Sequence, residues 1–168
     1  MNNFTKLMML LSALVLVIGG GFSFYLTYQG NQPVAAININ EAGIAIDGFD
    51  SVSYHTIGAA QKGAHNFQVT WNGAIWYFSS LENRQAFSEA PEEYAPQYGG
   101  YDPFGMAMNG TVQAATPELW LIAGGKLFLF HSGATRKAWQ ENLAENQKNA
   151  DIQWAKIKQQ IHYKAEMP

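Results

Sequence analysis

Short runs rich in aromatic and β-branched residues predict a β-hairpin in the middle of the chain. Its strands are expected at Phe67–Trp71 and Ala74–Ser79, with Asn72-Gly73 between them. This pair suits a two-residue type I′ turn, because both of its positions need a positive φ. Side chains alternate along a strand, so Trp76 lies on the face opposite to Tyr77. One of these two faces is expected to belong to the core.

A second hairpin and a helical C-terminus are predicted further along the chain. Leu119–Ala123 and Lys126–Phe130 are hydrophobic runs on either side of Gly124-Gly125, which is typical of two strands and a turn. From Ala134 onward the hydrophobic residues recur at helical spacing, with a break expected near Asn149. No internal repeat is evident in the sequence.

Capping residues and glycines place the shorter elements between the hairpins. Ser79 is expected to cap a helix, with Glu82 three residues later as its capping-box partner. Pro91 suits the first position of a second short helix, and Gly99-Gly100 allows a tight reversal close to other backbone. Two hairpins, short helices and a helical C-terminus together predict a small α+β domain.

The N-terminal residues 1–28 are expected to form a hydrophobic helix at a membrane. Leu7–Tyr28 is a mostly apolar run of about 20 residues, long enough to span a hydrocarbon core. Lys6 precedes it and favours an N-terminus that stays inside. The run is either an uncleaved signal anchor or a signal peptide with a cleavage site at Val34-Ala35-Ala36. We favour the anchor, because the run is longer than a typical signal-peptide core.

The remaining residues are expected to form a linker, 29–42, and a single domain, 43–163. The 168-residue chain has a net charge of −3 and no basic patch, which argues against nucleic acid as a partner. It has no cysteine, and this excludes disulfides, thiolate-bound zinc, iron–sulfur clusters and thiol redox chemistry. Five tryptophans and an aromatic content of 14% predict an aromatic-rich core.

Residues 43–154 contain several motifs in a distinctive order and spacing. These are DGFDSVSY from Asp47, WNGAIWYFSSLENRQAF from Trp71, PEEYAPQYGGY from Pro91, LWLIAGGKLFLF from Leu119 and RKAWQENLAENQKNADIQW from Arg136. In their order and spacing these motifs resemble the YHS domain family, in its secreted or periplasmic branch. The resemblance implies a small domain of this family's fold, placed in the periplasm.

The resemblance breaks at the position where the family usually carries a cysteine. In metal-handling relatives, cysteines in the corresponding loops are thought to bind metal. Where the secreted branch usually reads Gly-Gly-Tyr-Cys-Ala, this chain reads Gly99-Gly100-Tyr101-Asp102-Pro103. Thiolate chemistry implied by the family therefore does not apply to this chain. If the Gly-Gly-Tyr corner, residues 99–101, positions a metal or redox group in relatives, Asp102 occupies the place of that group in this chain.

A metal site is one candidate, at Met106, Met108 and His131. Met-x-Met is a pair of soft thioethers that suits Cu(I), and the two methionines share one face if the segment is a strand. Asp102 offers an oxygen ligand beside them. The alternative is that both methionines fill gaps in the core, and that His131 and His55 are surface or capping residues. Copper is the one cofactor that the sequence suggests.

Tyrosines and acids give a second candidate, a ligand pocket made of Asp50, Tyr54, Tyr98, Tyr101 and Asp102. A buried acid among phenols can act as a general acid or line a binding pocket. The alternative is that these side chains brace loops through hydrogen bonds to the backbone. No motif typical of a nucleophile elbow, a phosphate loop or a catalytic triad is present.

These observations predict a binding or interaction module, tethered to the inner membrane and facing the periplasm. Its ligand is unknown and is metal-related, a small molecule or a partner protein. If the signal is cleaved, the domain is instead secreted or free in the periplasm. The alternative function is an accessory subunit or an enzyme of a redox or metal-delivery system that uses the Tyr98–Asp102 corner. A solvent-reachable pocket at that corner would favour a ligand or metal site, and a packed corner would favour a scaffold.

Overall fold

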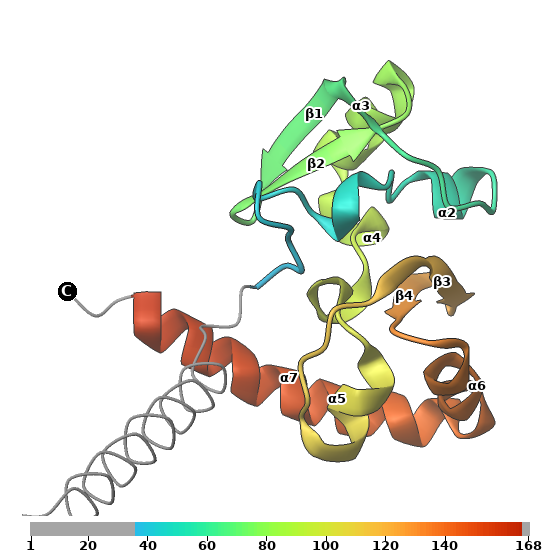
Figure 1. Ribbon diagram of the computed structural model, residues 1–168, viewed down its shortest axis with the longest axis vertical. Coiled ribbons are helices and arrows are strands. Elements are labelled where there is room, and N and C mark those ends of the chain that lie inside the picture. The colour runs from blue at the N-terminus through green and yellow to red at the C-terminus, as the bar shows by residue number, and fades with distance from the viewer. Residues whose placement is uncertain (1–35, 166–168) are drawn as a thin grey trace, which may run out of the picture. The chain divides into compact units, whose positions relative to one another are not determined.

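The computed structural model describes residues 36–165, with side chains described as far as Gln159 (Figure 1). Over this range the fold is α+β, with two antiparallel two-stranded sheets and six α-helices, as the sequence predicts. No helix among these residues is long and apolar enough to cross a membrane. The hydrophobic run Leu7–Tyr28 lies outside the described residues.

Each half of the domain contains one hairpin and its helices. The first half comprises η1 (Ile46–Gly48), α2 (Ser53–Thr56), β1 (Ala64–Trp71), β2 (Ala74–Phe78), α3 (Leu81–Glu89) and α4 (Pro91–Tyr94). The second half comprises η2 (Gln97–Gly100), α5 (Pro103–Asn109), β3 (Thr116–Ala123), β4 (Lys126–Phe130), α6 (Gly133–Glu141) and α7 (Leu143–Ala165). In Figure 1 the first hairpin and α3 lie at the top, and the second hairpin lies below them with α5, α6 and α7.

The two halves are copies of one structural repeat, contrary to the expectation from the sequence. Strand β1 begins at Ala64 and β3 begins at Thr116, so that the two strands start 52 positions apart. The same offset of 52 relates β2 to β4 and α3 to α6, and each pair has equal length. Both hairpins also share one register, with an irregularity at the same place. A constant offset means that no insertion or deletion separates these elements.

Backbone hydrogen bonds and dihedral angles recur at the same offset. Asp50 N donates to Gln61 O at 2.8 Å, and Asp102 N donates to Gln113 O at 2.9 Å. Left-handed backbone precedes each of these acids and forms each hairpin turn, at Ile46-Asp47-Gly48, Tyr98-Gly99-Gly100, Asn72-Gly73 and Gly124-Gly125. The positive φ at both positions of each turn is what the sequence predicts for the first hairpin.

Few side chains are identical in the two repeats, and for this reason the repeats are not evident in the sequence. The residues that recur 52 positions later include several that shape the backbone or a cap: Gly48, Asp50, Gly58, Gln61, Gly73, Phe78, Ser80, Arg84, Ala86 and Glu89. In the core, one aromatic residue replaces another. Trp76 corresponds to Phe128, and Phe87 corresponds to Trp139, and all four side chains are buried. The repeat therefore keeps turn geometry and hydrophobic character and changes most side chains.

Two hydrophobic clusters fill the domain, and the second hairpin lies between them. One cluster includes Trp76 and Phe87 of the first repeat, and the other includes Trp139 of the second. Strand β4 serves both, because Leu129 enters the first cluster and Phe128 enters the second. Side chains alternate along a strand, so the second sheet is covered on both of its faces.

One expected helix cap is displaced by a residue. Ser80 caps α3, since its Oγ accepts a hydrogen bond from Asn83 N at 3.1 Å. Ser79, the expected cap, instead donates through Oγ to the carboxylate of Asp50 at 2.6 Å. Pro91 does occupy the first turn of α4, as predicted.

The break in the C-terminal helical region lies earlier than predicted. It falls at Asn142, between α6 and α7, and not near Asn149, which lies inside α7. Asn146 explains the early break, because its Nδ2 donates to the carbonyl oxygens of Ala138 and Trp139, both at 3.1 Å. A side chain of α7 thus satisfies carbonyls at the end of α6, which a helix end otherwise leaves unpaired.

The described part of the predicted linker packs against the domain. Ile37 is buried, and Asn38 N donates to Gly99 O at 2.8 Å. Gly99 has a φ of 66°, and a Cβ placed on it would collide with the carbonyl oxygen of Ala36. A glycine is therefore required at this contact. The close backbone approach predicted for Gly99-Gly100 is confirmed.

Candidate functional site

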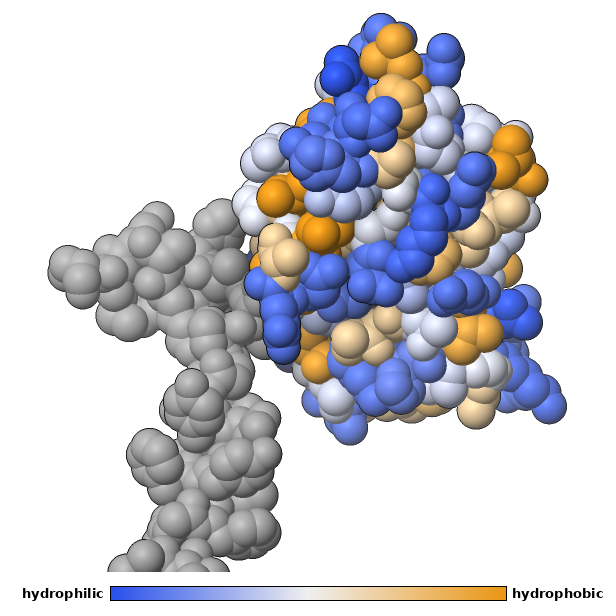
Figure 2. Space-filling view, turned by 45° about the horizontal axis from the view of Figure 1, so that its top comes forward, coloured by the Kyte–Doolittle hydropathy of each residue, from blue (hydrophilic) through white to orange (hydrophobic). Residues whose placement is uncertain are grey.

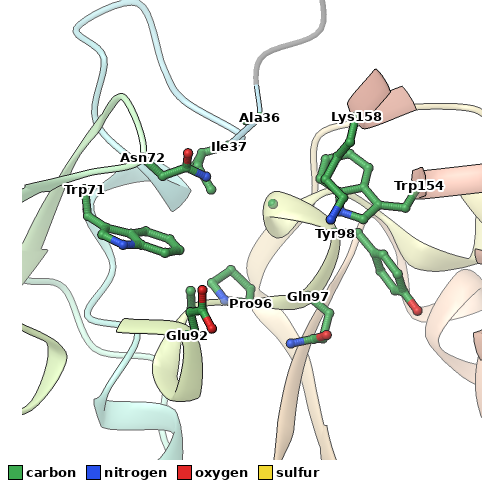
Figure 3. A pocket seen from close by; sticks show the side chains of 12 residues that line it. Ala36, Ile37, Trp71, Asn72, Glu92, Pro96, Gln97, Tyr98, Trp154 and Lys158 are labelled. Atoms are coloured by element: carbon green, nitrogen blue, oxygen red, sulfur yellow. The ribbon is translucent and has the colours of Figure 1, made fainter. Parts of the chain in front are cut away.

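An open groove between the two repeats is the candidate site (Figure 3). Its volume is about 490 Å³, within the range of roughly 300–1,000 Å³ that is usual for small-ligand pockets. The tip of the first hairpin, with Trp71, forms one wall, and α7, with Trp154, forms the other. The segment that joins α4 to η2 forms the base. Residues that belong to different repeats therefore meet around one cavity.

Aromatic neighbours hold both tryptophans in place. The Trp71 ring lies 5.8 Å from that of Trp76 and 5.7 Å from that of Phe87, measured between centroids and edge-on in both cases. Trp154 contacts Tyr98 in the same edge-on manner at 6.4 Å. Each wall is thus supported by its own hydrophobic cluster. Because the rings are fixed before a ligand arrives, binding costs little side-chain entropy.

Polar groups of both charges line the groove beside the tryptophans. Glu92 lies on the side of Trp71, and Lys158 lies beside Trp154 (Figure 3). The side chains of Asn72 and Gln97 add an amide group to each side of the opening. Among the residues that the structure describes, the one ion pair joins Lys62 to Asp47. The two charged groups of the groove are therefore available to a ligand.

Tyr98 lines the groove, but its hydroxyl group points away from the groove, toward Asp151. Figure 3 shows the Tyr98 hydroxyl directed away from the cavity. The hydroxyl donates to Asp151 Oδ1 at 2.9 Å. Burial, and then the hydrogen bond and negative charge of Asp151, raise the pKa of Tyr98 well above its ordinary value. The phenol therefore stays protonated and braces α7 against the corner.

Asp50 and Asp102 occupy equivalent positions of the two repeats, and each braces the loop of its own repeat. Each is fully buried. Asp50 accepts a hydrogen bond from Ser79 N, before the cap of α3, at 2.9 Å, and Asp102 accepts one from His131 N, before the cap of α6, at 3.4 Å. Asp102 also caps α5 by accepting from Gly105 N at 3.3 Å. These bonds match the bracing role that the sequence analysis gave as the alternative.

The other predicted pocket tyrosines are also engaged inside the protein. Tyr54 is buried, and its hydroxyl donates to Pro117 O at 3.0 Å. Burial, followed by the negative charges of Glu118 and Asp50, raises the pKa of Tyr54. The half-buried Tyr101 donates to Ile37 O at 3.4 Å, and burial raises the pKa of Tyr101 as well.

The five residues of the predicted ligand pocket come from both repeats. Asp50 and Tyr54 belong to the first repeat, whereas Tyr98, Tyr101 and Asp102 belong to the second. Of these five, Tyr98 alone lines the groove.

The Met-x-Met pair is not formed, because its segment is a helix and not a strand. Asp102 at the N-cap and Pro103 in the first turn start α5. Two residues apart on a helix, Met106 and Met108 point to different sides. Met106 is fully buried and Met108 is 53% exposed, so that only Met106 fills the core. His131 is exposed, and its Nδ1 lies 3.1 Å from Ala114 O.

Within the described residues, no cluster of three or more histidine, aspartate or glutamate side chains is arranged to hold a metal ion. Comparison of the chain with protein-family models, curated proteins and solved structures finds no match. The resemblance to the YHS family accordingly stays a prediction.

Sequence reasoning missed the groove, although it noticed some of its parts. Trp71 and Trp154 were recognised only as members of a strand and of a helical pattern, and Glu92 only as part of a short helix. Residues 71, 92 and 154 come together because α7 returns past the junction of the repeats. The sequence signal that bears on the groove is its number of tryptophans, five in all.

Proposed function

We propose that this chain is a membrane-tethered, YHS-like binding module that faces the periplasm and binds its ligand between Trp71 and Trp154. The groove is the observation on which this proposal rests. It combines rigid aromatic walls with a few polar groups, the combination usual in small-ligand sites. The predicted anchor, Leu7–Tyr28, would keep the module at the membrane surface.

The use of the tyrosines and acids supports a binding role for the domain. Asp50, Asp102, Tyr54 and Tyr98 all make internal hydrogen bonds that hold loops and helices. The groove tryptophans make ring contacts on their inner sides and leave a cavity between them. The domain thus has a rigid scaffold around one open site.

Fluorine NMR tests whether the groove binds ligands. The full-length chain in detergent is labelled with 5-fluorotryptophan, and its five resonances are assigned by Trp→Phe substitutions. A panel of amino acids, peptides, sugars and nucleotides is then added. We expect one class of compound to shift the resonances of Trp71 and Trp154 and to leave that of the buried Trp139 unchanged. A panel that moves neither groove resonance contradicts a groove for small ligands.

Fractionation tests the tether. We expect the full-length protein to stay with membranes through an alkaline carbonate wash and to be digested by protease only after the outer compartment is opened. N-terminal sequencing of the mature protein distinguishes the alternative. A mature chain that begins near Ile37 would show a cleaved signal and a free periplasmic domain.

A further inference from the structure

We propose that the groove takes a short peptide in its zwitterionic form, with the free amino end at Glu92 and the free carboxyl end at Lys158. This inference rests on the proposed function, because it names the ligand class of the same groove. It depends on three properties of the lining: opposite charges on the two walls, tryptophans facing the cavity, and an amide side chain on each side of the opening.

The charges select a ligand that carries both signs. Glu92 and Lys158 are exposed and lie on different walls of the groove (Figure 3). A purely anionic ligand would gain from Lys158 and be repelled by Glu92, and a cationic ligand would meet the reverse. A zwitterion gains at both ends. Because the groove is open to solvent, each contact is worth only about a two- to five-fold change in affinity.

The tryptophans and amides suit the body of a peptide. Indole faces pack well against planar peptide groups and apolar side chains. Asn72 and Gln97 each carry both donors and acceptors, as the N–H and C=O groups of a peptide bond require. The hydroxyls of a neutral sugar can hydrogen-bond to Glu92 and Lys158, but they carry no charge to pair with either side chain. A nucleotide can place its phosphates at Lys158, but it brings no cation to Glu92.

The rest of the surface supports this choice over a large apolar partner. On the face shown in Figure 2, hydrophobic residues are scattered among hydrophilic ones. The exposed large hydrophobic side chains, among them Ile57 and Met108, do not line the groove. A groove with opposite charges on its two sides favours a short ligand with two charged ends.

Capped peptides test the inference directly. The probe is the tripeptide Ala-Phe-Ala, compared with its N-acetylated, C-amidated and doubly capped forms, by fluorine NMR and calorimetry on the full-length chain. We expect each cap to weaken binding about two- to five-fold and both caps together about four- to twenty-five-fold. Dipeptide and tetrapeptide versions should reveal one preferred length, set by the separation of Glu92 and Lys158.

Charge-neutral variants assign each end to its wall. In Glu92→Gln, acetylation should no longer weaken binding, whereas amidation still should. In Lys158→Gln, the reverse is expected. Glu93→Gln and Lys156→Gln are matched controls, because both residues are exposed and neither lines the groove. All four positions are exposed, so that these changes should not affect folding.

The outcomes separate this inference from the proposed function. The zwitterion hypothesis is wrong if the doubly capped peptide binds as well as the free one. It is also wrong if Glu92→Gln and Lys158→Gln still prefer both free ends over capped ends. In either case the groove remains a binding site. If no form of the peptide shifts Trp71 or Trp154 while another class of compound does, the ligand class is wrong. If nothing shifts them, the proposed function and this inference are both contradicted.

Discussion

The two hairpins have the same backbone and very different surroundings. In the first, Trp76 is fully buried while Tyr77 on the other face is half-buried. In the second, the equivalent residues Phe128 and Leu129 are both buried, one in each hydrophobic cluster. The sheet of the first repeat is thus covered on one face. The sheet of the second repeat is covered on both faces and forms the middle layer of the domain.

The comparison shows which features belong to the local fold and which belong to packing. Turn glycines, serine caps and the buried acids recur in both repeats, because a hairpin followed by a capped helix needs them wherever it lies. The second face of the sheet is more hydrophobic in the repeat where another layer covers it, since Gln68 and Thr70 of the first hairpin correspond to Trp120 and Ile122 of the second. The first hairpin keeps an exposed strand, and its tip is free to form a wall of the groove.

The largest expected effect is the loss of Trp76, which packs at the centre of the first cluster. Trp76→Ala should reduce the free energy of unfolding by about 3–5 kcal/mol, because it removes a fully buried indole and leaves a cavity. Urea denaturation of the full-length chain measures the loss. Trp154→Ala, at a half-buried position, is the control and should cost clearly less. A loss below about 1 kcal/mol at Trp76 would place it outside the core.

The next prediction compares equivalent residues on the second face of each sheet. Leu129→Ala should cost about 2–5 kcal/mol, because Leu129 is buried in the first cluster. Tyr77→Ala, 52 positions earlier, should cost about 1 kcal/mol, because its side chain is only half-buried. Equal losses at the two positions would contradict the middle-layer role of the second hairpin.

Local elements followed from the sequence, and long-range ones did not. The hairpins, the Asn72-Gly73 turn and the Pro91 helix depend on neighbouring residues, so their patterns were sufficient. Met106 and Met108 would share a face only on a strand, and their segment is a helix. The signal for that helix was present in Asp102-Pro103, an N-cap followed by proline. The groove was not predictable in this way, because the return of Trp154 to the first hairpin depends on packing of the whole domain.

A smaller difference is expected between the two buried acids. The Asp50 carboxylate accepts from Ser79 Oγ and from Asn83 Nδ2, both at 2.6 Å, in addition to backbone N–H groups. Asp102 accepts two longer backbone bonds, at 3.3 and 3.4 Å. Asp50→Ala should therefore destabilise by about 2–3 kcal/mol and Asp102→Ala by about 1–2 kcal/mol. Thermal and urea unfolding of both variants test the order, and a larger loss at Asp102 would reverse it.

The smallest expected effect concerns His55, whose equivalent in the second repeat is the buried Ala107. The His55 ring packs edge-on against Tyr94 at 5.5 Å, and its Nε2 is buried without a hydrogen-bond partner among the described residues. Burial lowers the pKa of His55 below its ordinary value of about 6.5.

The sign of the pH effect follows from this shift in the His55 pKa. Below a pH of about 6.5, His55 binds a proton in the unfolded chain more readily than in the folded chain. The free energy of unfolding therefore falls as the pH is lowered through this value. Urea midpoints at pH 8.0 and pH 5.5 should differ more for the wild type than for His55→Gln, which cannot titrate. His65→Gln, on the exposed strand β1, controls for the loss of a histidine. If wild type and His55→Gln lose the same stability on acidification, the titration of another group is responsible for the loss.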